Sequence, residues 1–140
     1  MRMSEDEARR RFAAARVARL ATVSAAGRPH LVPIVFVVAG DVVYTAVDRK
    51  PKTTTALRRL ANIAAQPAVS LLVDEYDDDW DRLWWVRADG EAHAIDDDTA
   101  VTDAVERLTA RYPVYAEHPP PGPVVGIRVE RWSGWSAAPL

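Results

Sequence analysis

Short runs in which apolar residues alternate with polar ones, or follow one another directly, predict that most of this chain folds as β-strands. Such runs lie at 17–24, 30–38, 42–45, 68–73, 83–95, with a break at Asp89 and Gly90, and 124–132. The turn residues at 25–28 and 39–41 separate the first three runs, which predicts hairpins. The run 30–38 is apolar at nearly every position, so we expect both of its faces to be covered. Pro33 interrupts this run and must lie at a sheet edge or a bulge, because proline cannot donate to a ladder.

Three segments with helical spacing of their apolar residues predict helices between these strands. Ser4 with Glu7 forms a capping box that begins a helix ending near Ala15. Thr53 or Thr54 begins a second helix, which ends before 66–67, and 96–98 open a third. The residues 118–123 form a proline-rich linker. Strands joined by hairpins, with helices between them, favour a single mainly β domain over 1–140, a six-stranded antiparallel barrel with flanking helices.

Composition narrows the possible functions. The 140 residues are 49% hydrophobic, enough to fill one core, and include no cysteine, which excludes disulfides and thiolate chemistry. A net charge of −2 argues against nucleic acid as a partner, and no apolar run is long enough to cross a membrane. The N-terminus has no apolar signal segment, so we expect a cytoplasmic protein. His30, His93 and His118 lie in separate segments and do not form a zinc motif.

The strongest chemical signal is a group of cations after the strand at 42–45. Lys50 and Lys52 are the only lysines, and with Arg49, Arg58 and Arg59 they place five cations within eleven residues. They lie where a loop enters a helix, and helix N-termini and basic side chains both favour a phosphate. The alternative is a solvated basic loop that only aids solubility.

Aromatic and acidic residues between 74 and 85 allow several interpretations. Trp84 and Trp85 should point to opposite faces of a strand, so one can fill the barrel while the other meets a partner or a planar ring; both can also be core residues. The acidic residues 74–81 lack the spacing of a calcium loop. We expect a solvated loop in which Tyr76 and Trp80 tuck inward, with aspartates free to pair with arginines across a dimer.

Several segments, taken in order, resemble the pyridoxamine 5′-phosphate oxidase-like split β-barrels, whose fold binds FMN. The segments are Gly27–Ile34, Val43–Thr45, Asp48–Lys52, Leu60–Ile63, Pro67 and Trp85–Gly90. Within this superfamily the text DRKPK, LRRLANI and SLLVDEYDDDWDRLWWVRADG is most similar to the deazaflavin-dependent branch, which uses coenzyme F-420. The resemblance covers roughly 17–95.

The resemblance implies a homodimer with shared cofactor sites and assigns a role to each matching residue. The strand along the cofactor ring would contain His30, Leu31, Val32, Pro33 and Ile34, and the ribityl chain would be lined by Tyr44 and Thr45. The phosphate would be bound by Arg49, Lys50 and Lys52. Trp85 and Arg87 would reach the cofactor of the other subunit.

The same resemblance implies an oxidoreductase that transfers a hydride between reduced coenzyme F-420 and an electron-poor organic acceptor. Arg58 and Arg59, with Arg28 or Arg16, would suit the carboxylate tail of this cofactor. The C-terminal residues 131–140 depart from the signature of the oxidases that make vitamin B6. Tyr44, Tyr76 and His30 are candidate proton donors. The alternatives are an FMN-dependent oxidoreductase on the same fold, a non-catalytic cofactor carrier or sensor, and an interaction domain without a cofactor.

Overall fold

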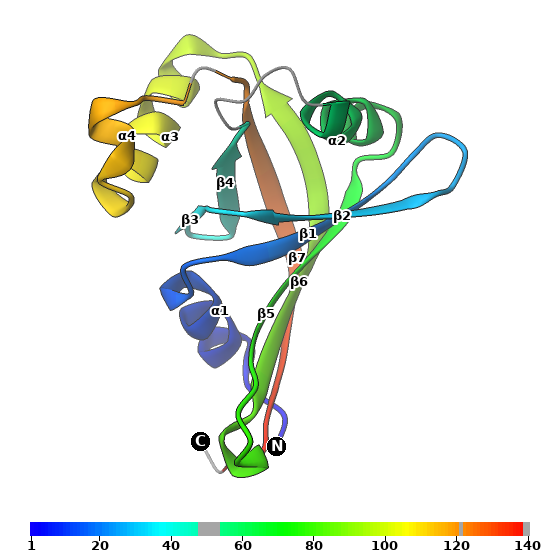
Figure 1. Ribbon diagram of the computed structural model, residues 1–140, viewed down its shortest axis with the longest axis vertical. Helices are drawn as coiled ribbons and strands as arrows, with labels where there is room; N and C mark the ends of the chain where they lie inside the picture. Colours follow the sequence, from blue (N-terminus) through cyan, green and yellow to red (C-terminus); the bar gives the residue numbers. More distant parts are fainter. Residues whose placement is uncertain (48–53, 121, 139–140) are drawn as a thin grey trace.

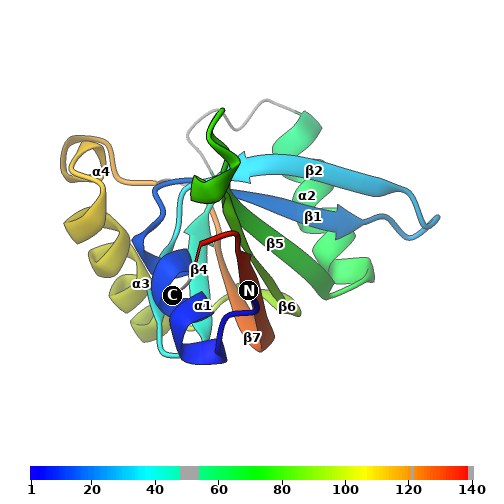
Figure 2. The same cartoon turned by 90° about the horizontal axis from the view of Figure 1, so that it is seen from below.

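The strands form one antiparallel sheet that curls into a barrel with helices around it (Figures 1 and 2). The computed structural model describes residues 1–47, 54–120 and 122–138. Its strands are β1 (Ala18–Val23), β2 (Pro29–Ile34), β3 (Val37–Ala39), β4 (Val42–Ala46), β5 (Ala68–Glu75), β6 (Trp84–Ile95) and β7 (Val124–Ser136). Its helices are α1 (Glu5–Ala14), α2 (Thr54–Ala65), α3 (Asp98–Arg111) and α4 (Val114–Glu117), with a 3-10 turn η1 (Trp80–Arg82). The expectation of a mainly β fold with flanking helices is confirmed.

Seven strands are described rather than six, because the run expected at 30–38 is two strands. The strand order is β2-β1-β5-β6-β7-β4-β3, so β2 and β3 lie at opposite edges of the sheet. Only Val35 and Phe36 connect them, and Phe36 is fully buried. The insertion of Phe36 into the core ends β2 and directs the chain to the other edge, which brings the two edges together. Pro33 lies on the edge strand β2, as its missing N–H requires.

The strands β6 and β7 form the longest pairing of the sheet and extend it to the end where both termini lie (Figure 1). β6 continues through Asp89 and Gly90, where its register with β7 shifts in a bulge instead of breaking the strand. β7 also continues past Trp132, because residues up to Ser136 pair with β6 as far as Trp84. The strand predicted from the sequence ends too early, because small and polar residues interrupt the apolar pattern of β7.

Helices α1 and α3 each close one part of the core. The Ser4 hydroxyl caps α1 by accepting from the Glu7 N–H at 3.1 Å, and the buried Phe12 packs its ring 4.9 Å from that of Phe36. The carboxylate of Asp97 caps α3 by accepting from the Ala100 N–H at 2.9 Å. Buried residues of α3 and α4 form a second core cluster with the end of β4: Ala46, Ala104, Leu108, Tyr112, Tyr115 and Val124.

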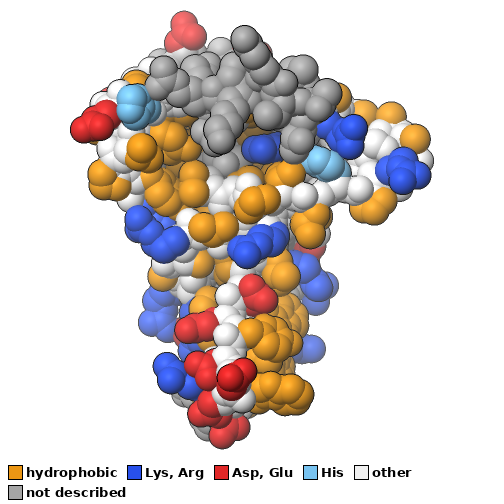
Figure 3. All heavy atoms as spheres, viewed as in Figure 1, with side chains coloured by type: hydrophobic (Ala, Val, Ile, Leu, Met, Phe, Trp, Pro, Cys, Tyr) orange, Lys and Arg blue, Asp and Glu red, His pale blue; other side chains and the backbone are white. Residues whose placement is uncertain are grey.

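The β5–β6 connection contradicts one expectation. Tyr76 and Trp80 do not tuck inward, since they are 69% and 74% exposed. The connection is held locally, where the carboxylates of Asp77 and Asp79 accept backbone N–H bonds from residues two positions later, and it lies at the end of the molecule where acidic side chains gather (Figure 3). Such a tip is too far from the core to bury an aromatic ring.

The neighbouring tryptophans do take opposite faces, as period-two alternation predicts. Trp84 packs against the main core, and its indole N–H donates to the Glu75 carboxylate at 2.7 Å. Trp85 lies on the other face, where the Arg87 guanidinium stands 5.8 Å from its ring centre. Within the chain, Arg87 pairs with Asp89 at 3.1 Å and Arg82 lies 3.9 Å from Asp77, while pairing across a dimer stays a prediction.

Candidate functional site

One pocket of about 390 Å³ opens where β2 ends, between the ends of β4 and α3. This main pocket is lined by Val17, Pro33, Ile34, Val35, Thr45, Ala46, Arg59, Tyr112, Val114 and Tyr115. Most of these side chains are apolar or aromatic, with few polar groups. A concave apolar site of this size with a few placed polar groups is typical of cofactor pockets.

A buried hydrogen bond fixes the wall between β2 and β4. The Thr45 side chain is 1% exposed, and its hydroxyl donates to the Val35 carbonyl oxygen at 2.7 Å. Val35 lies outside the strand ladders, so this bond satisfies a carbonyl that the sheet leaves without a partner. Thr45 thereby holds the connection between β2 and β3 against the pocket.

Tyr112 fixes the opposite wall. Its hydroxyl accepts from the Phe36 N–H at 3.2 Å and lies 2.8 Å from the Phe36 carbonyl oxygen, to which it donates. The guanidinium groups of Arg16 and Arg111 stand 5.1 and 5.4 Å from its ring centre, and the Tyr115 ring meets it edge to face at 6.2 Å. These contacts hold both tyrosine rings in place before any ligand arrives.

Arg111 links this wall to the barrel through backbone carbonyls. Its guanidinium donates to the Phe36 oxygen at 2.7 Å and also to the Ala15 oxygen. Partial burial lowers the pKa of Arg111 from its ordinary value, although an arginine stays charged throughout the range in which proteins are folded. Arg111 is therefore a fixed brace and not a proton donor.

Arg59 supplies the positive charge of the main pocket. It lies on α2 and is only 8% exposed, in contrast to its neighbour Arg58, which is exposed. A guanidinium in an apolar pocket favours an anionic ligand, because burial strengthens the attraction between opposite charges. The pocket also adjoins Ala46, the last residue of β4.

The pocket brings together part of the predicted set. Pro33, Ile34 and Thr45 line it, and their contacts with a cofactor ring and ribityl chain stay a prediction. Val32 is buried in the main core, and Leu31 is 66% exposed on the other face of β2. Alternation along β2 therefore separates side chains that the linear motif grouped together. Tyr44 packs against the second core cluster and does not line the pocket.

Of the remaining predicted residues, three are not described and the others line different hollows. Arg49, Lys50 and Lys52 fall outside the described residues. Trp85 and Arg87 lie on the outer face of β6 and share a different hollow with Trp135 and Arg131. They are not part of the main pocket of the same chain.

A second hollow, of about 340 Å³, contains two of the other predicted cations, Arg28 and Arg58. This hairpin hollow lies between the β1–β2 hairpin and α2 and is lined by Ser24, Arg28, Pro29, His30, Arg58 and Asn62. Positive side chains and a histidine gather on this part of the surface (Figure 3). Arg58 and Arg59 thus serve two different hollows, because successive helix residues point in directions about 100° apart.

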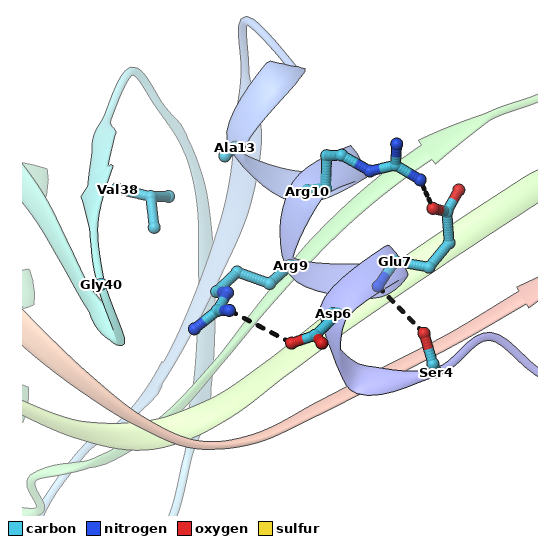
Figure 4. Close-up of a pocket in the computed structure, with 8 residues that line it drawn as sticks. All are labelled: Ser4, Asp6, Glu7, Arg9, Arg10, Ala13, Val38 and Gly40. Atoms are coloured by element: carbon cyan, nitrogen blue, oxygen red, sulfur yellow. Dashed lines mark hydrogen bonds and ion pairs between the residues drawn. The ribbon is translucent and has the colours of Figure 1, made fainter.

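A third hollow lies between α1 and the β3–β4 turn (Figure 4), and its charges are already paired. Glu7 binds both Arg10 and Arg11, and Arg9 binds Asp6 and Asp41 at 3.2 and 3.1 Å. It therefore has little charge to offer a ligand. Among the described residues, no group of histidine, aspartate or glutamate side chains is placed to hold a metal ion.

Sequence reasoning missed Tyr112, Val114 and Tyr115 as pocket residues. The available signal was the segment Tyr112–Tyr115, in which a proline follows a helix and two aromatic residues flank it. Proline is favoured at the start of a helix, and Pro113 is the N-cap residue directly before the short helix α4. Two tyrosines so close together indicate a buried segment rather than an exposed loop, but their position beside β4 depends on the tertiary fold.

The fold and the pocket define a split β-barrel with a candidate cofactor pocket beside its helices. Residues 4–136 match the pyridoxamine 5′-phosphate oxidase family, and the chain belongs to that family. No curated protein matches the chain. No helix within the described ranges is long and apolar enough to cross a membrane.

Solved structures share this fold along almost the whole chain. An FAD-binding protein from Mesorhizobium loti is 21% identical with a TM-score of 0.75, covering 96% of this chain and 95% of its own. The FAD-binding protein from Mycobacterium smegmatis is 18% identical with a TM-score of 0.67, covering 96% of both chains. The heme storage protein HutZ from Vibrio cholerae is 17% identical with a TM-score of 0.72, covering 96% and 95%. At these identities the likeness establishes the fold alone.

Proposed function

We propose that this protein is an oxidoreductase that uses coenzyme F-420, holding the deazaflavin ring in the main pocket. When bound, the reduced cofactor supplies a hydride to an electron-poor organic acceptor. The protein's own residues bind and orient the cofactor: Pro33 and Ile34 lie along the ring, Thr45 fixes the wall beside it, and the tyrosines of α3 and α4 exclude water. The acceptor also takes up a proton with the hydride, and none of these pocket residues is assigned as its donor.

The observation that carries this proposal is the combination of Arg59 with the apolar pocket. A cation 8% exposed among apolar and aromatic side chains suits a ligand with a flat ring and an anionic group. The sequence between Ala46, which lines the pocket, and Thr54 contains Arg49, Lys50 and Lys52. We expect these three residues to bind the cofactor phosphate.

We further propose that the protein is a homodimer whose subunits share their sites. Register pairs Leu72 with Arg87 and Asp74 with Trp85, so Trp85, Arg87 and Leu72 lie on one outer face of the sheet. Leu72 and Arg87 are exposed on this face, which would meet the second copy. Trp85 and Arg87 would then reach the partner's cofactor, as the family resemblance implies.

A flavin nucleotide is the second candidate, because two structural neighbours are described as FAD-binding proteins. A cofactor carrier is the third, because another neighbour is described as a heme storage protein. Coenzyme F-420 differs from a flavin nucleotide by its carboxylate tail and by its ring. Binding measurements therefore separate these cofactors, and turnover separates an enzyme from a carrier.

The test is a fluorescence titration of coenzyme F-420, FMN and FAD into the wild-type protein and a Lys50→Ala, Lys52→Ala variant. We expect F-420 to bind most tightly and its affinity to fall at least tenfold in the variant, since a charge-assisted contact contributes about 1.5–3 kcal/mol. Arg128→Ala, which removes an exposed cation on β7, is the control and should bind like wild type. Unchanged affinity in the lysine variant contradicts the phosphate assignment.

A second measurement separates an enzyme from a carrier. The reoxidation of reduced F-420 is followed with a quinone or an unsaturated ketone as the acceptor, with and without protein. An oxidoreductase accelerates it catalytically. Tight binding without acceleration by any such acceptor contradicts the proposed activity and favours a carrier.

A further inference from the structure

We infer that the hairpin hollow is a second binding subsite, which holds a carboxylate group between Arg28, Arg58 and His30. The hollow is separate from the main pocket and takes its residues from the β1–β2 hairpin and from α2. The family match and the structural neighbours do not assign it a role. Charge, a buried nitrogen atom and a rigid frame each support the inference.

Two arginines from different elements converge on this hollow without a counter-ion. Arg28 belongs to the hairpin turn and Arg58 to α2, and neither has an ion pair or a hydrogen-bonded carboxylate among the described residues. Arginines elsewhere, such as Arg11 and Arg107, do have carboxylate partners at 2.8 and 2.9 Å. Like charges that face one hollow repel, and an anion between them removes that repulsion. Guanidinium groups also fit a planar carboxylate with two parallel hydrogen bonds.

His30 contributes an unsatisfied polar atom at the same place. Its ring is half-buried, and its Nδ1 atom is buried without a hydrogen-bond partner. A buried ring nitrogen without a partner costs free energy, and most such atoms in folded proteins are paired. Because His30 lines the hollow, a ligand carboxylate placed there can accept a hydrogen bond from the imidazole.

The frame around the hollow is held by hydrogen bonds that do not involve these three side chains. Ser24 accepts from the Arg28 N–H at 3.0 Å through its hydroxyl, and the Gln66 amide donates to the Ser24 carbonyl oxygen at 2.9 Å. The Asn62 amide donates to the Thr22 hydroxyl at 3.0 Å. These bonds tie the hairpin to α2 on both sides, so the arginines need little rearrangement to bind.

The position of the hollow indicates where the carboxylate comes from. His30 and Pro33 lie three residues apart on β2, which separates the hairpin hollow from the main pocket by about 10 Å. One elongated ligand can therefore fill both. In that respect the inference rests on the proposed function: the carboxylate belongs either to the tail of the cofactor or to an acidic acceptor beside the ring.

The first experiment tests the subsite without any cofactor. Triglutamate is titrated into the full-length protein while the histidine ring resonances are followed by NMR. We expect the His30 signal to move and the signal of His93, exposed on β6, to stay. Affinity should fall at least tenfold in R28Q/R58Q and remain at the wild-type value in R107Q/R128Q, which makes the same change of net charge elsewhere. A stationary His30 signal, or equal affinity in both double variants, overturns the inference.

The second experiment identifies the source of the carboxylate. Coenzyme F-420 and the same deazaflavin phosphate without its glutamyl tail are titrated into wild type and R28Q/R58Q. If the tail occupies the hollow, only the complete cofactor loses affinity in the variant. If the affinity for triglutamate falls in R28Q/R58Q while the affinities for both forms of the cofactor stay at the wild-type values, the subsite stands and its carboxylate is that of the acceptor. If wild type binds triglutamate but no deazaflavin, the proposed function fails while the subsite stands.

Discussion

At the scale of single residues, the site depends on side chains whose polar atoms are used before a ligand arrives. The hydroxyl groups of Thr45 and Tyr112 both form hydrogen bonds with the Val35–Phe36 connection. The apolar parts of these two side chains then face the main pocket. Their role is to position the walls, so their loss should affect stability before it affects chemistry.

Thr45→Val should destabilise the protein by about 1–3 kcal/mol, because the Val35 carbonyl oxygen loses its buried donor while the side-chain volume is nearly kept. Urea unfolding followed by tryptophan fluorescence measures the change. Thr102→Val is the control: this hydroxyl also donates to a carbonyl, that of Asp98 at 2.9 Å, but it is exposed and water replaces it. Equal effects of the two substitutions would contradict this account.

Tyr112→Phe should also lower the free energy of unfolding by about 1–3 kcal/mol, since the Phe36 N–H is buried and would lose its acceptor. The matched control is Tyr76→Phe, at a side chain 69% exposed, where no change is expected. Thermal unfolding of the two variants side by side tests this difference. A Tyr112→Phe protein as stable as wild type would show that its hydroxyl does not brace the wall.

At the scale of elements, the strand β6 depends on its bulge. Gly90 lies where the register with β7 shifts, and a Cβ atom there would stand 2.1 Å from the Arg128 carbonyl oxygen. The obstacle is backbone, which cannot move aside as a flexible side chain can. The sequence marked this position as a break in a strand. In the structure both strands are continuous, and they approach each other closely at Gly90.

Gly90→Ala should therefore cost about 3 kcal/mol or more, at the upper end of the range for overpacking. Gly40→Ala tests whether the loss of any glycine has this effect. Gly40 has a φ of 62° with open space around it, so alanine there should cost only about 1–2 kcal/mol of backbone strain. Chemical denaturation of both variants gives the comparison. A smaller loss at Gly90 than at Gly40 would contradict the role of the close approach.

At the scale of the whole molecule, one face of the sheet is left to solvent. Leu31 pairs with Ala21, which pairs with Ser70, so Leu31 and Leu72 lie on the same outer face of β2, β1 and β5. They are 66% and 38% exposed. Exposed apolar side chains gathered on one sheet face mark an interaction surface. This face supports the proposed dimer.

Leu31→Glu, Leu72→Glu should convert the dimer that we expect for the wild type into a monomer, because carboxylates would be buried against each other at the interface. Sedimentation velocity measures the mass of each form. Tyr76→Glu, at an exposed aromatic on the β5–β6 connection, should leave the dimer intact. A wild type that sediments as a monomer, or a double variant that remains a dimer, contradicts the assignment of this face.

The sequence by itself determined the local structure of this protein and predicted a type of ligand. Alternation and helical spacing predicted most strands and the helices α1, α2 and α3, since both patterns depend on neighbouring residues only. Ser4 marked the start of α1, and Pro33 marked an edge. The grouping of arginines with the only two lysines predicted an anionic ligand, because the charge of a side chain does not depend on the fold.

The tertiary structure decided which of these residues meet. Phe36 divides one apolar run into two strands at opposite edges of the sheet, because the core has room for its ring. Closure of the barrel then brings Tyr112 and Thr45, far apart in the chain, to the same pocket, and it forms the two hollows that Arg58 and Arg59 line. Such contacts depend on packing between distant segments, and no local pattern contains that information.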